Sequence, residues 1–159
     1  MVNPAPLANN AAISDANTDT LLVAYGNDSC PIDSASGVAS AVTLNVQAYA
    51  VKNGNLMQCD YLASNCTVAA NWTQIASGIV SMKAECNGSQ SIRVALVTRN
   101  PQLEKTVVTA AAPTWSGAGA IVLTATAVDA GFTWQNYRYK TFETLVPIRN
   151  TIWSGATGC

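Results

Sequence analysis

The pair Asn53 and Gly54, set between two strand-like runs, is the feature that most constrains the fold of this chain. Before it, residues 42–52 read VTLNVQAYAVK and alternate between apolar and polar side chains, as a half-buried strand does. After it, residues 55–58 read NLMQ. Asn-Gly suits the two central positions of a tight hairpin turn, because both positions need a positive φ. The sequence therefore predicts an antiparallel hairpin centred on this pair.

A second Asn-Gly pair, Asn87 and Gly88, predicts a second hairpin. The strand after it spans residues 91–98, with apolar side chains on alternate positions. The strand before it lies within residues 74–86, whose apolar positions fit either a helical stripe or a strand. Glycine costs about 1 kcal/mol inside a helix, so Gly78 favours a turn that leads into a strand.

Three other segments are predicted as strands: the short apolar run at residues 20–25, and residues 106–109 and 120–128, which are rich in β-branched residues. The intervening residues 100–120 carry Pro101, Pro113 and several Gly and Ser, which indicates a long irregular connection.

Residues 134–153, WQNYRYKTFETLVPIRNTIW, concentrate aromatic and basic side chains in a chain with only 11% charged residues. Their alternation shifts phase near Thr141, since the apolar side chains beyond it lie on the side that held Arg138 and Lys140. This shift predicts a bulge, or a strand that passes from one packed layer to another. Pro147 cannot donate a ladder hydrogen bond, so pairing should weaken there or the strand should lie at a sheet edge.

Glu143 and Arg149 share a face of this segment but are six residues apart, about 20 Å along a strand. They cannot pair with each other within one strand. Each therefore needs a partner from elsewhere in the fold.

The chain has five cysteines and no histidine. This composition favours disulfides in an oxidising compartment. Zinc sites normally need paired cysteines or histidines, and no CxxC occurs. Cys59 and Cys66 are close enough in sequence to bridge easily, which would stabilise the chain by about 2–3 kcal/mol. For a further bond we favour Cys30 with Cys86, which leaves Cys159 free or terminal.

The composition argues against most catalytic and nucleic-acid functions. Without histidine, a Ser-His or Cys-His nucleophile cannot be built. No glycine-rich phosphate loop is present, and the spacing of Asp60, Glu85, Asp129 and Glu143 does not suggest a carboxylate pair. A net charge of −1 gives no electrostatic footprint for nucleic acid. We expect no catalytic residue, no metal site and no cofactor.

At 159 residues the chain is expected to form one domain. Residues 1–18 contain two Pro and four Asn without periodicity, and are expected to be a flexible N-terminal segment. Residues 19–159 are expected to form the single globular domain. No export signal is visible at the start, and we expect the sequence to begin partway into a longer exported protein.

Residues 137–144, YRYKTFET, with residues 146–150, VPIRN, and Trp153, resemble the closing signature of PilW-type minor pilins of bacterial type IV pili. Earlier blocks resemble the same family in the same order, at residues 49–59, 75–82, 93–99, 104–105 and 113–115. Gln58 departs from the pattern, because the family often has a basic residue there. The resemblance spans roughly residues 20–153.

The resemblance implies an α+β pilin-like fold, predominantly antiparallel β with little helix in this chain. The sheet of such a fold packs on an apolar N-terminal helix, which is not in this sequence. Apolar positions in residues 21–25 or 142–148 are then expected to be exposed or self-associated.

The implied function is that of a non-catalytic subunit of the pilus tip complex, which primes pilus assembly. Its partners would be other minor pilins, the major pilin and a tip adhesin, with no nucleic acid and with the membrane reached only through the helix. Its place would be the periplasmic face of the inner membrane and then the extracellular pilus tip. The structural or interface candidates are Tyr137, Arg138, Tyr139, Lys140, Phe142, Glu143, Arg149 and Trp153.

Two alternative functions remain open at this point. A minor pseudopilin of a type II secretion system would share the fold. An extracellular carbohydrate-binding β-sandwich would instead use aromatic side chains as a sugar platform. Core packing of those aromatic side chains is the favoured interpretation.

Overall fold

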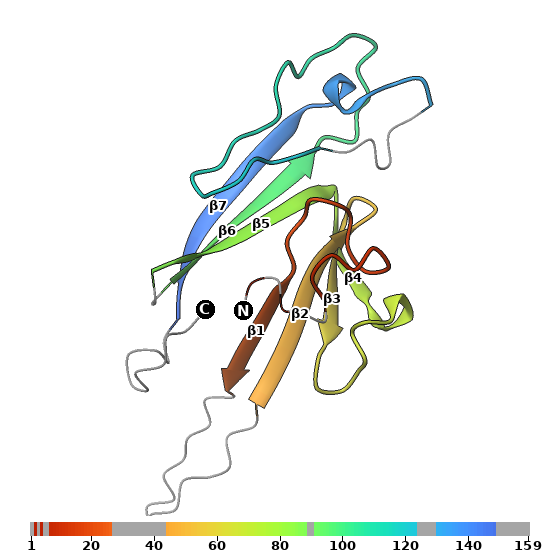
Figure 1. The fold of residues 1–159 in the computed structure, drawn as a ribbon. Coiled ribbons are helices and arrows are strands. Elements are labelled where there is room, and N and C mark those ends of the chain that lie inside the picture. The colour runs from red at the N-terminus through yellow and green to blue at the C-terminus, as the bar shows by residue number, and fades with distance from the viewer. Residues whose placement is uncertain are drawn as a thin grey trace, which may run out of the picture.

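The computed structural model describes residues 2, 4, 7–26, 44–88, 91–123 and 130–148. In this part of the chain, seven strands form two antiparallel sheets and the only helices are two single 3-10 turns (Figure 1). The first sheet has the order β1-β2-β3-β4 and the second the order β5-β6-β7. The strands are β1 Leu21–Gly26, β2 Leu44–Lys52, β3 Asn55–Asp60, β4 Thr73–Ser77, β5 Ile79–Asn87, β6 Ser91–Arg99 and β7 Tyr139–Pro147. The 3-10 turns are η1 Ala69–Asn71 and η2 Trp134–Asn136. The expectation of a mostly antiparallel β protein with little helix is confirmed.

The first predicted hairpin is confirmed in position and in register. Lys52 pairs with Asn55, so Asn53 and Gly54 form a two-residue loop between β2 and β3. Their φ angles are 51° and 74°. Both values lie in the left-handed region that a two-residue hairpin turn requires, and Asn and Gly tolerate this region.

The second hairpin is confirmed in position, but its loop is longer than its Asn-Gly pair suggests. Asn87 already belongs to β5 and pairs with Ser91 of β6. As a result Glu85 lies opposite Arg93. Gly88 again has a positive φ, of 67°.

Gly78 separates β4 from β5, which confirms the turn predicted there and excludes the helical alternative. Its φ is 76°. The chain leaves the first sheet at Ser77 and enters the second at Ile79. The strand β4 was not predicted, because residues 73–77 show no clear alternation.

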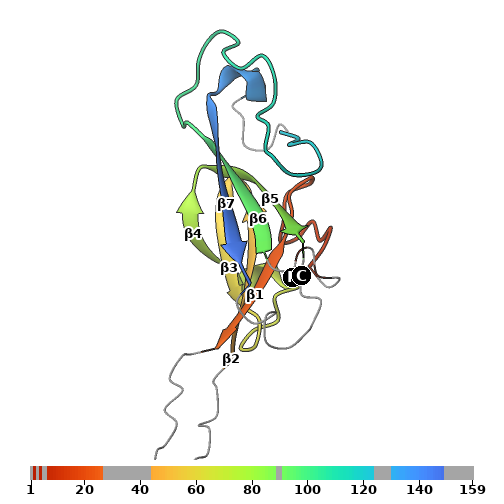
Figure 2. The ribbon, with the colours of Figure 1, turned by 90° about the vertical axis from the view of Figure 1, so that its left-hand side faces the viewer.

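The two sheets pack face to face around one apolar layer (Figure 2). Its buried members are Leu21, Val51, Ile79, Met82 and Ala84, contributed by β1, β2 and β5. Half-buried side chains from β3, β4 and β6 pack against them. This layer holds the second sheet in place and therefore positions β7.

The other face of the first sheet is covered by the N-terminal segment and by the loop after β3. Leu7 and Ile13 are almost fully buried there, together with Trp72. Asp15 also pairs with Lys52, at 3.6 Å, and accepts a hydrogen bond from the Asn53 N–H. The segment expected to be flexible over residues 1–18 is thus held by the core in its described part.

The Cys59–Cys66 disulfide is present, as predicted. It closes the loop that carries Trp72 back to the sheet, and the Trp72 indole N–H donates to the Cys66 carbonyl at 2.9 Å. Cys86 is also disulfide-bonded. Its predicted partner Cys30, and Cys159, lie outside the described residues.

Two predicted strands are wrong in the part of the connection that the structure describes. Residues 106–109 are irregular, and Val108 and Thr109 both donate to the Gln135 carbonyl. Residues 120–123 are not a strand either, and residues 124–128 lie outside the described part. Ile121 and Leu123 are apolar because they pack with Val97 against the outer face of the second sheet. Their hydrophobicity reflects burial of the loop against the sheet, and it does not indicate a strand.

Among the described residues, no helix has the length and apolar character needed to span a bilayer.

Candidate functional site

Strand β7 lies at the edge of the second sheet (Figure 1) and carries four of the eight structural or interface candidates: Tyr139, Lys140, Phe142 and Glu143. Its pairing with β6 runs without interruption from Arg99 opposite Tyr139 to Ser91 opposite Pro147. The predicted bulge near Thr141, and the alternative passage between layers, are therefore wrong. The edge position predicted from Pro147 is confirmed.

The phase shift in the sequence arises because each face of β7 contacts a different environment. Tyr139 packs with Trp134 and Val97 under the long connection, on the outer face of the sheet. Phe142 and Val146 lie on the opposite face, opposite Leu96 and Ile92 of β6. A regular strand can therefore carry apolar residues at odd-numbered and at even-numbered positions.

On the outer face, three charged side chains hold the loop at residues 115–119 against the sheet. Arg93 bridges Glu85 at 2.9 Å and donates to the Ser116 carbonyl at 2.8 Å. The Ser116 N–H donates to Glu143, and the Ala118 N–H donates to Glu85. Glu143 thus finds its partner in the loop, and Arg149 lies outside the described residues.

Gly117 is required where this loop meets Trp115 and Glu85. A Cβ at this position would lie 2.5 Å from the Trp115 ring and 2.6 Å from a Glu85 carboxylate oxygen. We expect Gly117→Ala to lower the free energy of unfolding by about 1–3 kcal/mol, because an overpacked side chain must shift. Urea unfolding followed by Trp fluorescence measures the loss.

Gly54→Ala is the matched control for this prediction. Its new Cβ meets no atom within 4 Å, but its φ of 74° is strained for alanine. It should therefore cost about 1–2 kcal/mol while leaving the native Trp fluorescence unchanged. Native fluorescence of Gly117→Ala identical to that of the wild type would contradict the contact with Trp115.

The inner face of β7 continues the apolar face of β5 and β6 beyond the area that the first sheet covers. Leu96 and Ile92 pack in the layer between the sheets, whereas their neighbours Phe142 and Val146 are 52% and 47% exposed. Leu145, on the outer face, is 52% exposed. We call Phe142, Leu145 and Val146 the β7 surface. Apolar exposure expected in residues 142–148 is confirmed. In the other expected segment, residues 21–25, Tyr25 is 49% exposed whereas Leu21 is buried.

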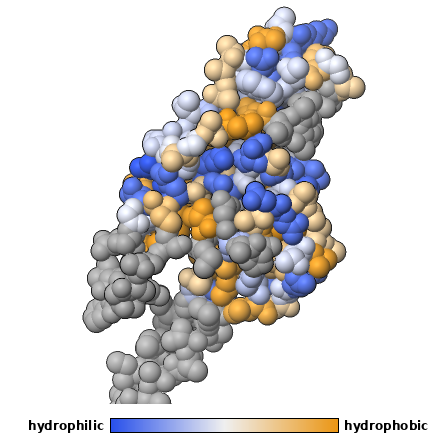
Figure 3. Space-filling view, viewed as in Figure 1, coloured by the Kyte–Doolittle hydropathy of each residue, from blue (hydrophilic) through white to orange (hydrophobic). Residues whose placement is uncertain are grey.

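On the face of the molecule in Figure 3, apolar and hydrophilic residues are interspersed. Next to Phe142, the Lys140 ammonium lies 4.9 Å from the centre of its ring. The exposed aromatic ring is thus flanked by a cation.

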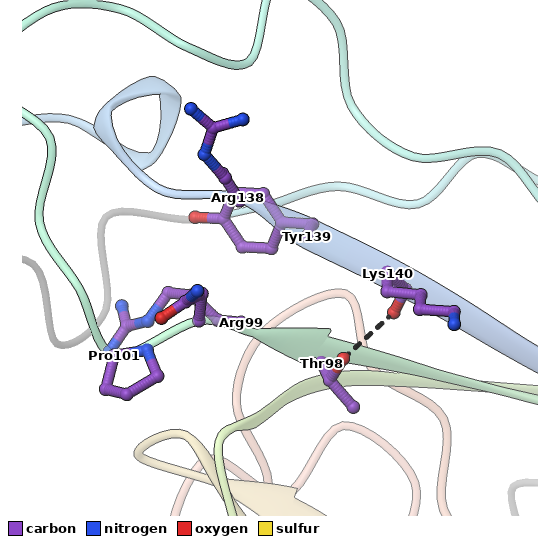
Figure 4. Close-up of a pocket in the computed structure, with 7 residues that line it drawn as sticks. Thr98, Arg99, Pro101, Arg138, Tyr139 and Lys140 are labelled. Atoms are coloured by element: carbon purple, nitrogen blue, oxygen red, sulfur yellow. Dashed lines mark hydrogen bonds between the residues drawn. The ribbon is translucent and has the colours of Figure 1, made fainter.

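A shallow hollow of about 410 Å³ lies where β6 ends and β7 begins. Its lining residues are Thr98, Arg99, Asn100, Pro101, Arg138, Tyr139 and Lys140 (Figure 4). The cationic groups of Arg99, Arg138 and Lys140 point in different directions. Arg99 lies 4.6 Å from the Tyr137 ring centre, and Arg138 bridges Glu104 at 3.3 Å. The hollow therefore lacks the convergent donors of an anion-binding pocket.

Tyr139 borders this hollow, and burial raises the pKa of its phenol above the usual value of 10.0. Tyr137 adds to the rise, whereas Arg99 lowers the pKa. Above about pH 10 the unfolded phenol ionises while the folded phenol keeps its proton, so stability falls as the pH rises. The contribution of Tyr139 is fully present below that pH.

We expect Tyr139→Phe to flatten the decline in the urea midpoint above about pH 10. The variant also loses the hydrogen bond from the phenol to the Trp134 carbonyl, which should lower stability at every pH. The slope above pH 10 is therefore the diagnostic quantity. A slope equal to that of the wild type would contradict the assignment.

Each of the described tryptophans packs against other residues of the chain. Trp72 is buried beside the disulfide, and Trp134 packs edge-on against Tyr139. Trp115 packs on the Val97 cluster and donates to the Gly119 carbonyl. Their packing bears out the interpretation of these side chains as structural, while Trp153 lies outside the described residues.

The structure thus divides the candidate residues into separate groups. Tyr137 is buried, and Arg138, Tyr139 and Lys140 line the hollow. Phe142 is exposed, and Glu143 anchors the loop. Sequence reasoning missed Glu85, Arg93 and Ser116 as the partners in that anchor. Their pairing depends on the register of the second hairpin, which the Asn-Gly pair did not predict.

In the described ranges, no three His, Cys, Asp or Glu residues lie close enough together to hold a metal ion. Comparison with known proteins found no matching family model, no matching curated protein and no matching solved structure.

Proposed function

We propose that this chain is the head of a PilW-type minor pilin with an α+β pilin-like fold, which acts in type IV pilus assembly by docking other subunits. The observation that carries the proposal is the β7 surface. Here an apolar sheet face extends from the core, at Leu96 and Ile92, to the exposed side chains Phe142 and Val146. Contiguous exposed apolar surface is a feature of protein–protein interaction sites.

The energetics of the surface suit assembly. Full burial of an apolar side chain of this size contributes about 1.5–3 kcal/mol. The two inner-face side chains of the β7 surface, Phe142 and Val146, are each about half exposed. Covering them would therefore contribute about 1.5–3 kcal/mol. This free energy is enough to favour one subunit over another at a given position in a fibre, because the contacts of neighbouring subunits add to it.

The proposed partners are other minor pilins and the major pilin, in a tip complex that primes polymerisation and carries a tip adhesin. In the family, an apolar N-terminal helix packs on the sheet, and the inner face of β7 has the apolar character for such a contact. The proposed location is the periplasmic face of the inner membrane and then the pilus tip. The mechanism is surface complementarity.

Deletion of the gene in its host tests the proposal. We expect surface pili, counted by electron microscopy, to be lost and to return when the gene is restored in trans. The secretion of type II substrates should be unchanged. Normal pili together with lost secretion would replace the proposal with the pseudopilin alternative, and two unchanged phenotypes would contradict both.

A further inference from the structure

The outer edge of β7 exposes a row of backbone groups whose identity follows from the hydrogen bonds at its start. The Asn100 N–H donates to the Arg138 carbonyl, whereas the Arg99 N–H points the other way, to Gly78 next to β5. Backbone groups of successive residues alternate in direction along a strand. Even-numbered residues of β7 therefore bond to β6, and odd-numbered residues point outward.

Four consecutive outward positions offer both an N–H and a C=O: Tyr139, Thr141, Glu143 and Leu145. The fifth, Pro147, has no N–H to donate. In the described part of the chain, no backbone hydrogen bond outside the β6–β7 ladder involves these positions. The edge is thus open for four residues and closed by proline after them.

The opposite edge of the same sheet is protected. The Asp19 N–H donates to the Met82 carbonyl of β5, and the Asp19 carboxylate accepts from the Ala84 N–H. The N-terminal segment therefore occupies the edge of β5. Exposed edges usually carry such a cover, and β7 has none in the described ranges.

We propose that β7 pairs antiparallel with β7 of a second copy of this chain, about a two-fold axis at Phe142. In this register Tyr139 lies opposite Leu145 of the second copy, and Thr141 lies opposite Glu143. All four open positions are used, for about eight interchain backbone hydrogen bonds. Phe142 lies opposite Phe142, so the two exposed aromatic side chains of the inner face cover each other.

Neighbouring registers are less favourable. A two-fold axis at Glu143 would oppose two carboxylates and would place Pro147 opposite Tyr139. An axis at Thr144 would place Pro147 opposite Thr141, with the loss of a hydrogen bond. Like charges directly opposite one another destabilise a strand pair. The register at Phe142 avoids both defects, and it places Lys140 opposite Thr144.

A single strand pair buries a small area, so we expect a reversible dimer. The inference does not rest on the proposed function. The dimer is tested with the purified 159-residue chain, whereas the proposed function is tested by counting pili in the host. Failure of one test therefore does not decide the other.

Cysteine cross-linking tests the dimer and its register together. The two copies of residue 142 form a non-hydrogen-bonded pair with Cα atoms about 4.5 Å apart, within the range that a disulfide spans. We expect Phe142→Cys to give a covalent dimer under mild oxidation. Two copies of Thr144 would be offset by four residues, or about 13 Å. Thr144→Cys should therefore remain monomeric.

Ile75→Cys, on the exposed edge strand β4, is the control for random collisions, and the wild type is the control for native cysteines. Far-UV circular dichroism checks that each variant is folded. Sedimentation of the wild type should show dimers that increase with concentration, and Phe142→Lys should stay monomeric. Equal cross-linking of all three variants, or the absence of cross-linking in both folded Phe142→Cys and folded Thr144→Cys, would overturn the proposal. Cross-linking at Thr144 alone would overturn the register.

Discussion

Replacement of Met82 by alanine is expected to lower the free energy of unfolding by about 2–5 kcal/mol. Met82 is 2% exposed and lies in the layer between the two sheets, among Leu21, Val51, Ile79 and Ala84. The truncation removes apolar burial and leaves a cavity between sheets that cannot easily close. Urea unfolding followed by circular dichroism measures the loss.

Ile75→Ala is the control, because it removes a similar volume from a side chain that is 47% exposed. Its effect should stay within about 0.5 kcal/mol. A Met82→Ala effect no larger than that of Ile75→Ala would mean that the sheets do not pack face to face.

Removal of the Cys59–Cys66 disulfide, by alanine at both positions, is expected to cost about 2–3 kcal/mol. The bond constrains the unfolded chain over a short loop, and both cysteines are buried with Trp72 in the layer outside the first sheet. The indole of Trp72 should gain solvent contact as its hydrogen bond to Cys66 loosens. Urea midpoints and the Trp emission maximum report the two effects.

Reduction of the wild-type chain breaks this bond and that of Cys86 together. The double alanine variant should therefore lose less stability than the reduced wild type loses, and reduction should destabilise the variant further. Stability of the variant equal to that of the oxidised wild type would contradict a structural role for this bridge.

The hairpins illustrate how far local signals reach. Asn53 and Gly54 predicted both the position and the register of the first hairpin, because a two-residue loop leaves one choice. At the second hairpin the same dipeptide predicted the position alone. There Asn87 extends β5, and the longer loop sets Glu85 opposite Arg93. A local motif could not predict this register, and with it the anchor of the loop at Ser116.

Burial by distant segments explains the other differences between the predicted and the observed structure. Leu7 and Ile13 are isolated apolar residues without periodicity, yet they complete the core on the outer face of the first sheet. Ile121 and Leu123 have strand-like composition but lie in a loop that packs on Val97. In each case tertiary contacts outweigh local propensity. Single-sequence patterns do not contain those contacts.

The edge position of β7 is one of the two outcomes that Pro147 predicted, but the interpretation of its phase shift was wrong. Apolar residues of both parities suggested a bulge near Thr141, whereas the strand is regular and contacts different partners on its two faces. The side with no partner in the described part of the molecule carries Phe142 and Val146. That side is the basis for the proposed role in assembly.

The most direct test of that role is the number of surface pili in the deletion strain when it expresses the Phe142→Lys, Val146→Lys double variant. Both side chains are about half exposed, so we expect the variant to fold and accumulate as the wild type does. The account predicts that the double variant fails to restore pili, whereas Ile75→Lys restores them. Wild-type numbers of pili with the double variant would contradict the assignment of β7 as the docking surface.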